Sequence, residues 1–217
     1  MRKDPEERKD EMIDAAERLF SAKGYQDTSV DDICDELGVA HGLFYYYFDS
    51  KEDVIKALTE RFINELESNL EQIVKDQDLK ADEKFLKFLN LSFQRKKKRP
   101  YLASYFSRED SPKIYYTLFN ETVEALVPFL TQIVEQGVEE EVFNTEFPEQ
   151  TILFWLNGRL FLFDQDRFEE NKFFEDIKAE AYLLERLLGT EDDFLTDFYE
   201  EHENEIEDFI EEVNQGD

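Results

Sequence analysis

Apolar residues recur every three to four positions along most of the chain, which is the period of a helix with one buried face. The first such stripe occupies residues 12–20 and stops at Gly24, a residue suited to a helix end. Ser29 and Asp32 have the spacing of a capping box and open a short helix that stops at Gly38. No alternating pattern typical of strands competes, so we expect an all-α fold.

The same period predicts a short helix at about 40–47 and a long one from Ser50 to about Val74. Residues 113–135 carry apolar stripes on two faces, so that helix should be central, and Pro128 within it predicts a kink or a break. Further helices are expected near residues 82–95, 101–107, 148–163, 173–188 and 193–213.

Composition narrows the class of protein. The 217 residues include 54 Asp and Glu against 25 Lys and Arg, a net charge of -29, yet 41% are hydrophobic and 15% aromatic, which argues against disorder. One cysteine excludes an intrachain disulfide, and two histidines cannot supply a histidine-rich metal site. No apolar run reaches the roughly 18 residues of a membrane span, and no signal peptide is recognised. We expect a cytoplasmic protein without metal, cofactor or membrane partner.

Residues 28–51 combine a capped short helix, a tight turn at Gly38 and Val39, and a second short helix. This is the spacing of a helix-turn-helix, in which the first helix braces the second so that its N-terminal side chains reach base edges in the major groove.

The same segment resembles the N-terminal domain of TetR-type transcriptional regulators. The resemblance covers about residues 11–61 and rests on Gly24-Tyr25, Thr28-Ser29-Val30, Asp32-Ile33, Leu37-Gly38-Val39, Gly42, Phe44-Tyr45, Tyr47-Phe48 and Ser50-Lys51-Glu52. It implies a helix-turn-helix DNA-binding domain over residues 6–66 and a larger ligand-binding and dimerisation domain over 67–190. The helical period and the excess of Asp and Glu predict an acidic C-terminal helix over 191–217.

Several side chains of this segment are candidates for DNA contact. Tyr45 and Tyr47 can offer hydroxyls to phosphates, and the resemblance assigns this role to them and to Lys51. His41 can bond a base edge, and Tyr46 can lie over a base. Three consecutive tyrosines cannot all face inward on one helix, so at least one should be exposed. The predicted contact residues are Thr28, Ser29, His41, Gly42, Leu43, Tyr45, Tyr46, Tyr47 and Lys51.

Charge is the main objection to DNA binding, because affinity for DNA rests largely on cations that displace counterions. Residues 1–60 hold eight Lys and Arg against sixteen Asp and Glu. However, the segment Gly38–Phe48 contains no acidic residue, so the expected contact surface carries no negative side chain of its own to repel phosphates. With few cations, binding should depend only weakly on salt.

In the larger domain, the resemblance implies a pocket for a small molecule and a dimer interface. Aromatic and amide side chains are the pocket candidates, although such aromatics are more often simply core: Phe88, Asn90, Tyr105, Tyr115, Tyr116, Phe119, Asn120 and Trp155. Adjacent leucine stripes suggest that a second copy covers Leu156, Leu160, Phe163, Leu183, Leu184, Leu187 and Leu188.

Taken together, the patterns and what the resemblance implies predict a homodimeric transcriptional regulator, a repressor that binds a palindromic operator and is released by a small molecule. They do not suggest an enzyme, because no glycine-rich phosphate loop, His-Glu-x-x-His pattern or cysteine–histidine pair is available. The alternative is an acidic scaffold that binds a basic partner, which would leave the acid-free segment Gly38–Phe48 unexplained.

Overall fold

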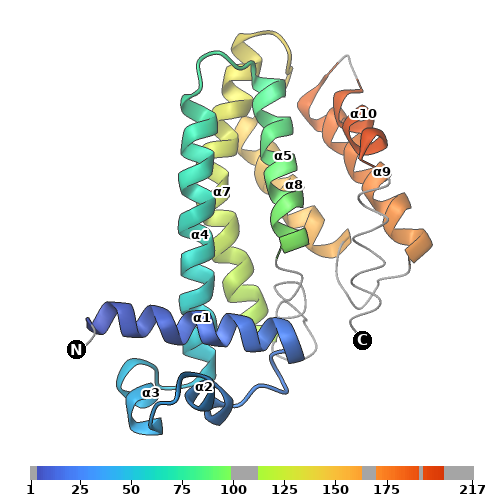
Figure 1. Cartoon of the computed structure of the whole chain (residues 1–217). Helices are drawn as coiled ribbons and strands as arrows, with labels where there is room; N and C mark the ends of the chain where they lie inside the picture. Colours follow the sequence, from blue (N-terminus) through green and yellow to red (C-terminus); the bar gives the residue numbers. More distant parts are fainter. Residues whose placement is uncertain (1–3, 99–111, 163–169, 191–192, 203–217) are drawn as a thin grey trace. The chain divides into compact units, whose positions relative to one another are not determined.

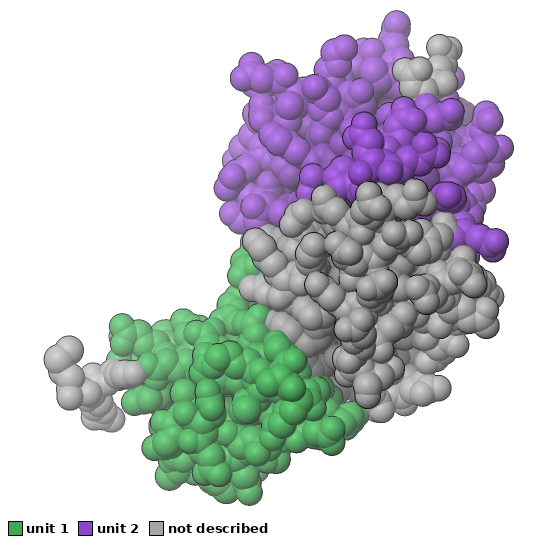
Figure 2. Space-filling model, turned by 45° about the vertical axis from the view of Figure 1, so that its right-hand side comes forward, with its two compact units in different colours: residues 1–66, 99–106 green, residues 67–98, 107–217 purple. Residues whose placement is uncertain are grey.

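The computed structural model describes residues 4–98, 112–162, 170–190 and 193–202, and all regular structure in these ranges is helical. The all-α prediction is therefore confirmed. The chain divides into two compact units, one of residues 1–66 with 99–106 and one of residues 67–98 with 107–217 (Figure 2).

The first unit contains α1 (Pro5–Lys23), α2 (Val30–Leu37), α3 (His41–Tyr47) and the first part of α4 (Lys51–Lys75) (Figure 1). Its helix ends follow the capping signals in the sequence. Ser29 and Asp32 form the expected reciprocal box at the start of α2. Gly38, with φ 62°, ends α2 in the left-handed conformation that glycine adopts without a steric cost.

The core of this unit comes from the apolar stripe of α1 and the inner faces of α2 to α4. Phe20, Ile33 and Phe44 are fully buried, and Phe48 lies against Phe44 with ring centroids 5.7 Å apart. On the surface, Arg61 of α4 donates to Asp14 at 2.6 Å and to Glu17, both on α1. This pairing connects α4 with α1.

Among the described residues, the second unit contains the rest of α4 together with α5 (Ala81–Lys98), α7 (Pro112–Glu139), α8 (Pro148–Leu162), α9 (Glu170–Leu188) and α10 (Phe194–Glu201). α7 packs against α5 and α8, α8 packs against α9, and α10 contacts α9 and α5. The prediction of a break at Pro128 is wrong, because α7 continues through it. Pro128 is exposed there, and its missing donor does not end the helix.

The chain leaves α7 by a tight turn. The backbone N–H groups of Val142 and Phe143 both donate to the carbonyl of Gly137, at 2.9 and 3.0 Å. The Phe143 ring then lies so close to Gly137 that an added Cβ would be 2.0 Å from the ring atom Cδ2. Position 137 therefore requires glycine, because any larger residue would collide with the Phe143 ring.

Two predicted helices cannot be compared fully with the structure. The helix expected at residues 101–107 lies outside the described residues, and so does the part beyond His202 of the helix expected at 193–213.

Candidate nucleic-acid interface

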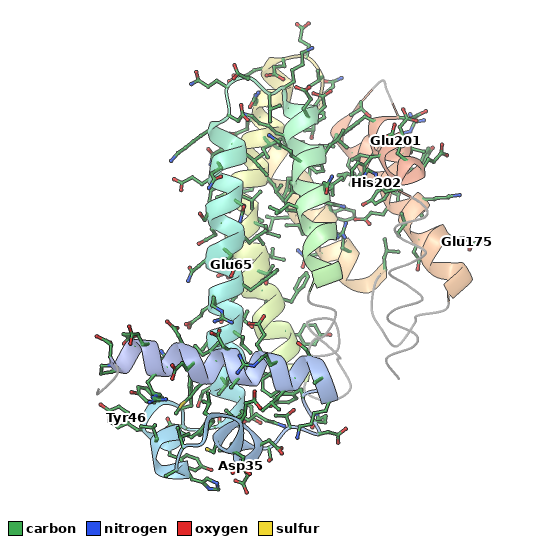
Figure 3. All side chains as sticks on the ribbon, in the orientation of Figure 1. Asp35, Tyr46, Glu65, Glu175, Glu201 and His202 are labelled. Atoms are coloured by element: carbon green, nitrogen blue, oxygen red, sulfur yellow. The ribbon has the colours of Figure 1, made fainter. Side chains whose placement is uncertain are left out.

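α3 has one buried and one exposed side. Phe44 is completely buried, whereas the exposed fractions of its neighbours Tyr45 and Tyr46 are 55% and 73%. Figure 3 shows Tyr46 extending away from the ribbon of the first unit. Large aromatic side chains that a small helix leaves in water indicate a surface that meets a partner.

The other predicted contact residues differ in how accessible they are. Gly42 is exposed, and nothing lies within 4 Å of the place where a Cβ would stand. Leu43 and Tyr47 are half-buried. Thr28 is buried, and its hydroxyl donates to the carbonyl of Gly24 at 2.7 Å. The Thr28 hydroxyl therefore serves the loop between α1 and α2 and is not presented to a phosphate.

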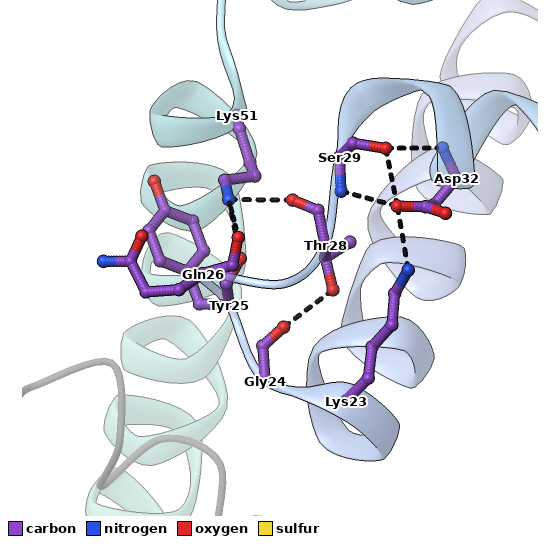
Figure 4. A network of polar contacts seen from close by, with 8 residues as sticks. All are labelled: Lys23, Gly24, Tyr25, Gln26, Thr28, Ser29, Asp32 and Lys51. Atoms are coloured by element: carbon purple, nitrogen blue, oxygen red, sulfur yellow. Dashed lines mark hydrogen bonds and ion pairs between the residues drawn. The ribbon is translucent and has the colours of Figure 1, made fainter.

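Ser29 is exposed, but its hydroxyl is engaged in the cap of α2. It accepts from the N–H of Asp32 at 3.1 Å and donates to the Asp32 carboxylate at 2.5 Å. Lys23 lies 2.8 Å from the same carboxylate (Figure 4). Lys23, and then the hydroxyl and N–H of Ser29, hold the pKa of Asp32 well below its ordinary value.

His41, the first residue of α3, is exposed and lies beside an acidic side chain. Its Nε2 is 3.3 Å from Oδ1 of Asp31 on α2, so the two form an ion pair whenever the imidazole is protonated. Asp31 is the carboxylate that a phosphate would meet next to His41. Contact between His41 and DNA therefore competes with Asp31.

The cations of the described residues 4–66 all have contacts within the protein. Five of them form ion pairs: Arg8 with Glu11, Arg18 with Glu36, Lys23 with Asp32, Lys56 with Asp53, and Arg61 with both Asp14 and Glu17. Lys9 lies 5.9 Å from the ring centroid of Phe48. Lys51 is half-buried, and its ammonium is bonded to three backbone carbonyls. The surface around α3 thus has few cations to offer to phosphates.

The candidate pocket residues of the second unit are not all gathered in one place. Phe88 and Trp155 are buried in an aromatic cluster with Phe85, with ring centroids 5.4 to 6.3 Å apart. Asn90 and Asn120 are exposed, and Tyr116 and Phe119 are half-buried. Tyr105 and the side chain of Tyr115 lie outside the described residues.

A buried polar cluster joins α8, α9 and α10 and was not predicted. Trp155 Nε1 donates to Glu180 Oε1 at 2.8 Å, Arg159 pairs with the same oxygen, and Arg159 also bonds the Tyr199 hydroxyl. Burial, and then the charge of Glu180, raise the pKa of Tyr199 to about 12. One signal in the sequence was available: Glu180 stands on the apolar stripe of α9, three residues after Ile177.

The candidate dimer residues also differ in how exposed they are. Leu156, Leu184 and Leu188 are buried within the unit itself and leave little surface for a second copy. Leu187 is half-buried, and Phe163 and the side chain of Leu160 lie outside the described residues. Three large side chains on α8 and α9 are exposed instead: Phe154 at 71%, Tyr182 at 55% and Leu183 at 53%. The sequence reasoning named only Leu183 of these three.

Other kinds of site find no support in the described ranges. They contain no cluster of histidine, cysteine or carboxylate side chains suited to a metal ion. Nor does any helix among them have the length and apolar character needed to cross a membrane.

The capped α2, the left-handed turn at Gly38 and the outward aromatics of α3 together define a helix-turn-helix domain. Residues 12–58 match the family model of bacterial regulatory proteins, tetR family. The resemblance seen in the sequence is thereby confirmed, and the N-terminal part of the chain is a tetR-family domain.

Individual known proteins are similar to parts or to the whole of the chain. The transcriptional repressor KstR2 of Rhodococcus jostii is 36% identical over 67 residues, which are 31% of this chain and 33% of that protein. RolR in complex with resorcinol shares the fold with a TM-score of 0.64 and 17% identity, over 89% of this chain and 93% of the other. FadR of Bacillus subtilis, in complex with stearoyl-CoA, has a TM-score of 0.55 and 21% identity, over 82% of this chain and 96% of the other.

The extent of these similarities differs between sequence and fold. The chain matches about a third or less of the length of two curated relatives, KstR2 among them. The structures of FadR and RolR cover 82% and 89% of this chain. KstR2 is a transcriptional repressor and FadR a transcriptional regulator, a class of proteins that is not enzymatic. Beyond the N-terminal domain, the comparisons establish the fold.

Proposed function

We propose that the chain is a transcriptional repressor that binds a palindromic DNA operator as a homodimer and is released by a small-molecule inducer. The observation that carries this proposal is α3, which turns Tyr45 and Tyr46 into solvent while Phe44 fixes its other side. The second helix of a helix-turn-helix reads base edges in the major groove, and this helix lies in a segment without acidic residues.

Within the proposed interface, side chains divide into those that read bases and those that position the protein. His41 and Tyr46 are proposed to meet base edges, with Gly42 and Leu43 allowing close apolar approach. Tyr45 and Tyr47 are proposed to meet phosphates, whereas Ser29 uses both its hydroxyl and its N–H as donors to Asp32. Because the nearby cations have internal partners, the affinity should fall only weakly as salt rises.

The test is a gel shift with a duplex taken from the DNA upstream of the protein's own gene, over a salt series. Tyr45→Phe should weaken binding to matched and mismatched duplexes alike, and His41→Ala should relax preference at one base position. Phe147→Leu is the control, because Phe147 is an aromatic residue of similar exposure, 59%, that lies outside the proposed DNA contacts and dimer interface. If the folded protein shifts no duplex at any salt, the acidic scaffold becomes the better hypothesis.

The homodimer is proposed to form through α8 and α9, where Phe154, Tyr182 and Leu183 remain exposed. A second copy related by two-fold symmetry would cover these side chains and present two α3 helices to successive major grooves. Leu183→Arg should give monomers in light scattering at micromolar concentration and weaken operator binding. Phe147→Arg, at a residue 59% exposed just before α8, should leave the dimer intact.

The inducer is proposed to bind in the second unit, near the aromatic cluster of Phe85, Phe88 and Trp155. Trp155 is the chain's only tryptophan, so its fluorescence reports events in this cluster. Resorcinol and stearoyl-CoA, bound by RolR and FadR, are suitable first probes. A probe that changes the Trp155 emission should also lower DNA affinity, and unchanged affinity with a bound probe would contradict the proposed induction.

A further inference from the structure

The ammonium of Lys51 caps the loop between α1 and α2. Lys51 stands in the first turn of α4, and its Nζ donates to the carbonyl oxygens of Tyr25 at 2.6 Å, Thr28 at 2.8 Å and Gln26 at 3.4 Å (Figure 4). The same nitrogen lies 3.9 Å from the centroid of the Tyr25 ring. A lysine ammonium has three N–H donors, and here three oxygens face it. We refer to Lys51 with Tyr25, Gln26 and Thr28 as the Lys51 cap.

The neighbouring residue Glu52 holds the same loop from a second direction. The Tyr25 hydroxyl donates to the Glu52 carboxylate, and burial, followed by the charge of Glu52, raises the pKa of Tyr25. The backbone N–H of Glu52 and the Tyr25 hydroxyl keep the pKa of Glu52 below its ordinary value. Two successive residues of α4, Lys51 and Glu52, therefore bind the loop between α1 and α2.

This loop determines where α2 and α3 lie. Thr28 directly precedes Ser29, the residue that caps α2, and its hydroxyl ties it back to Gly24 at the end of α1. If the carbonyls of residues 25–28 shift, the start of α2 shifts with them. α3 follows α2 after a short turn, so its exposed tyrosines are placed by the same contacts.

A phosphate contact by Lys51 would have to displace this cap. The ammonium would give up three hydrogen bonds in a half-buried site for one interaction at the protein surface, where water and salt screen charges. The partners of Lys51 in the folded chain are therefore better than those that DNA would provide.

We propose that Lys51 is a positioning residue: its cap fixes α2 and α3 to α4, and it does not neutralise a phosphate. This inference rests on the proposed DNA-binding function and deepens it. α4 is one unbroken helix from Lys51 to Lys75, and the boundary between the two units falls within it after Leu66. The cap thus fastens the helix-turn-helix to the first turn of a helix shared by both units.

Salt dependence separates the two roles. Each phosphate contact contributes a slope of about 0.9 to the fall of log K with log salt concentration. On the upstream duplex, Lys51→Met should lower affinity at least about tenfold at every salt concentration without changing this slope, because the loss is one of geometry. A slope reduced by about one contact, with unchanged loop structure, would overturn the proposal.

Lys51→Arg sharpens the test, because arginine keeps the charge and binds phosphate at least as well as lysine does. Its planar guanidinium cannot direct donors to three converging carbonyls, so the cap predicts a loss of affinity. Full affinity would overturn the proposal. Lys56→Met, one turn further along α4 at an exposed lysine, is the matched control and should change neither affinity nor loop structure.

Hydrogen exchange in the DNA-free protein tests the cap independently of DNA binding. Lys51→Met should speed exchange of the amides of Thr28 and Ser29, which donate to the Tyr25 carbonyl and to Asp32, whereas Lys56→Met should not. If the unchanged protein binds no duplex, the proposed function fails. The exchange measurement still shows whether the Lys51 cap holds the loop between α1 and α2. Equal exchange in both variants would contradict the cap.

Discussion

The two units use their charged side chains in different ways. In the first unit, helix-to-helix pairs such as Arg18 with Glu36, and Arg61 with Asp14, keep at least one partner well exposed to solvent. In the second, Glu180, Glu185 and Lys84 are buried and bond to groups far away in the sequence. Surface pairs contribute little because water competes for both ions, whereas a buried ion costs several kcal/mol if its partner is lost.

This difference predicts where the chain is sensitive. Carboxylates are abundant, so most of them on the surface should be replaceable with little effect. The few carboxylates that the second unit buries should not be.

The largest effect is expected at Glu180, which is only 3% exposed. Glu180→Ala leaves Arg159 without its carboxylate and the Nε1 group of Trp155 without its acceptor, at a cost of about 3–5 kcal/mol in unfolding free energy. Denaturation followed by Trp155 fluorescence measures this loss. The control Asp14→Ala removes one side of a surface pair and should cost less than about 1 kcal/mol. Equal losses would contradict the contrast between the units.

A second effect is expected at Glu185, which caps α10 from another helix. Its Oε1 accepts from the N–H groups of Leu195 and Thr196, both at 2.9 Å, and its Oε2 accepts from the Thr196 hydroxyl at 3.1 Å. Glu185→Ala should cost about 1–3 kcal/mol and speed amide exchange at Leu195 and Thr196. Glu200→Ala, an exposed acid on α10, should leave those amides protected.

Two glycines should respond to alanine in opposite directions. At Gly137, the new Cβ would lie 2.0 Å from the Phe143 ring, so Gly137→Ala should destabilise the second unit by about 1–3 kcal/mol. At Gly42 in α3, nothing lies within 4 Å, so Gly42→Ala should stabilise the first unit by up to about 1 kcal/mol through helix propensity. Thermal unfolding of the two variants checks both signs. Destabilisation by Gly42→Ala would show that α3 needs its glycine even without DNA.

The smallest effect is expected at Asp32, whose carboxylate lies on the surface. Its pKa is depressed in the folded chain, so its contribution to stability is present above the ordinary aspartate pKa of about 3.9 and is lost as pH falls below it. The difference in stability between the unchanged protein and Asp32→Asn should therefore shrink on acidification. A difference that stays constant down to pH 2 would exclude this linkage.

Sequence reasoning succeeded where partners are close along the chain. Ser29 and Asp32 are three residues apart, and their reciprocal cap was predicted from this spacing. The same holds for Gly38, which ends α2, and for the expectation that at least one of the three consecutive tyrosines is exposed, because Tyr45 and Tyr46 are. In each case the interaction or the exposure depends on residues that are only a few positions apart in the sequence.

Sequence reasoning was less informative where partners are distant. Lys51 is 26 residues from Tyr25, and its charge in the first turn after Ser50, together with the family resemblance, suggested a phosphate contact. Pro128 was expected to kink or break α7, and the helix is not broken there. Leu156, Leu184 and Leu188 were assigned to a dimer interface because an apolar stripe does not say which helix covers it.

The sequence by itself determined the helices, their caps and the acid-free recognition segment, because helical hydrogen bonds and caps join residues at most a few positions apart. The tertiary structure alone decided which charges are buried and what they bond. Glu180 and Glu201 are the same residue type in an acidic chain, yet one is buried between helices and the other is exposed. Packing between segments far apart in the sequence makes that choice, because it determines which side chains lose their water and which groups replace it.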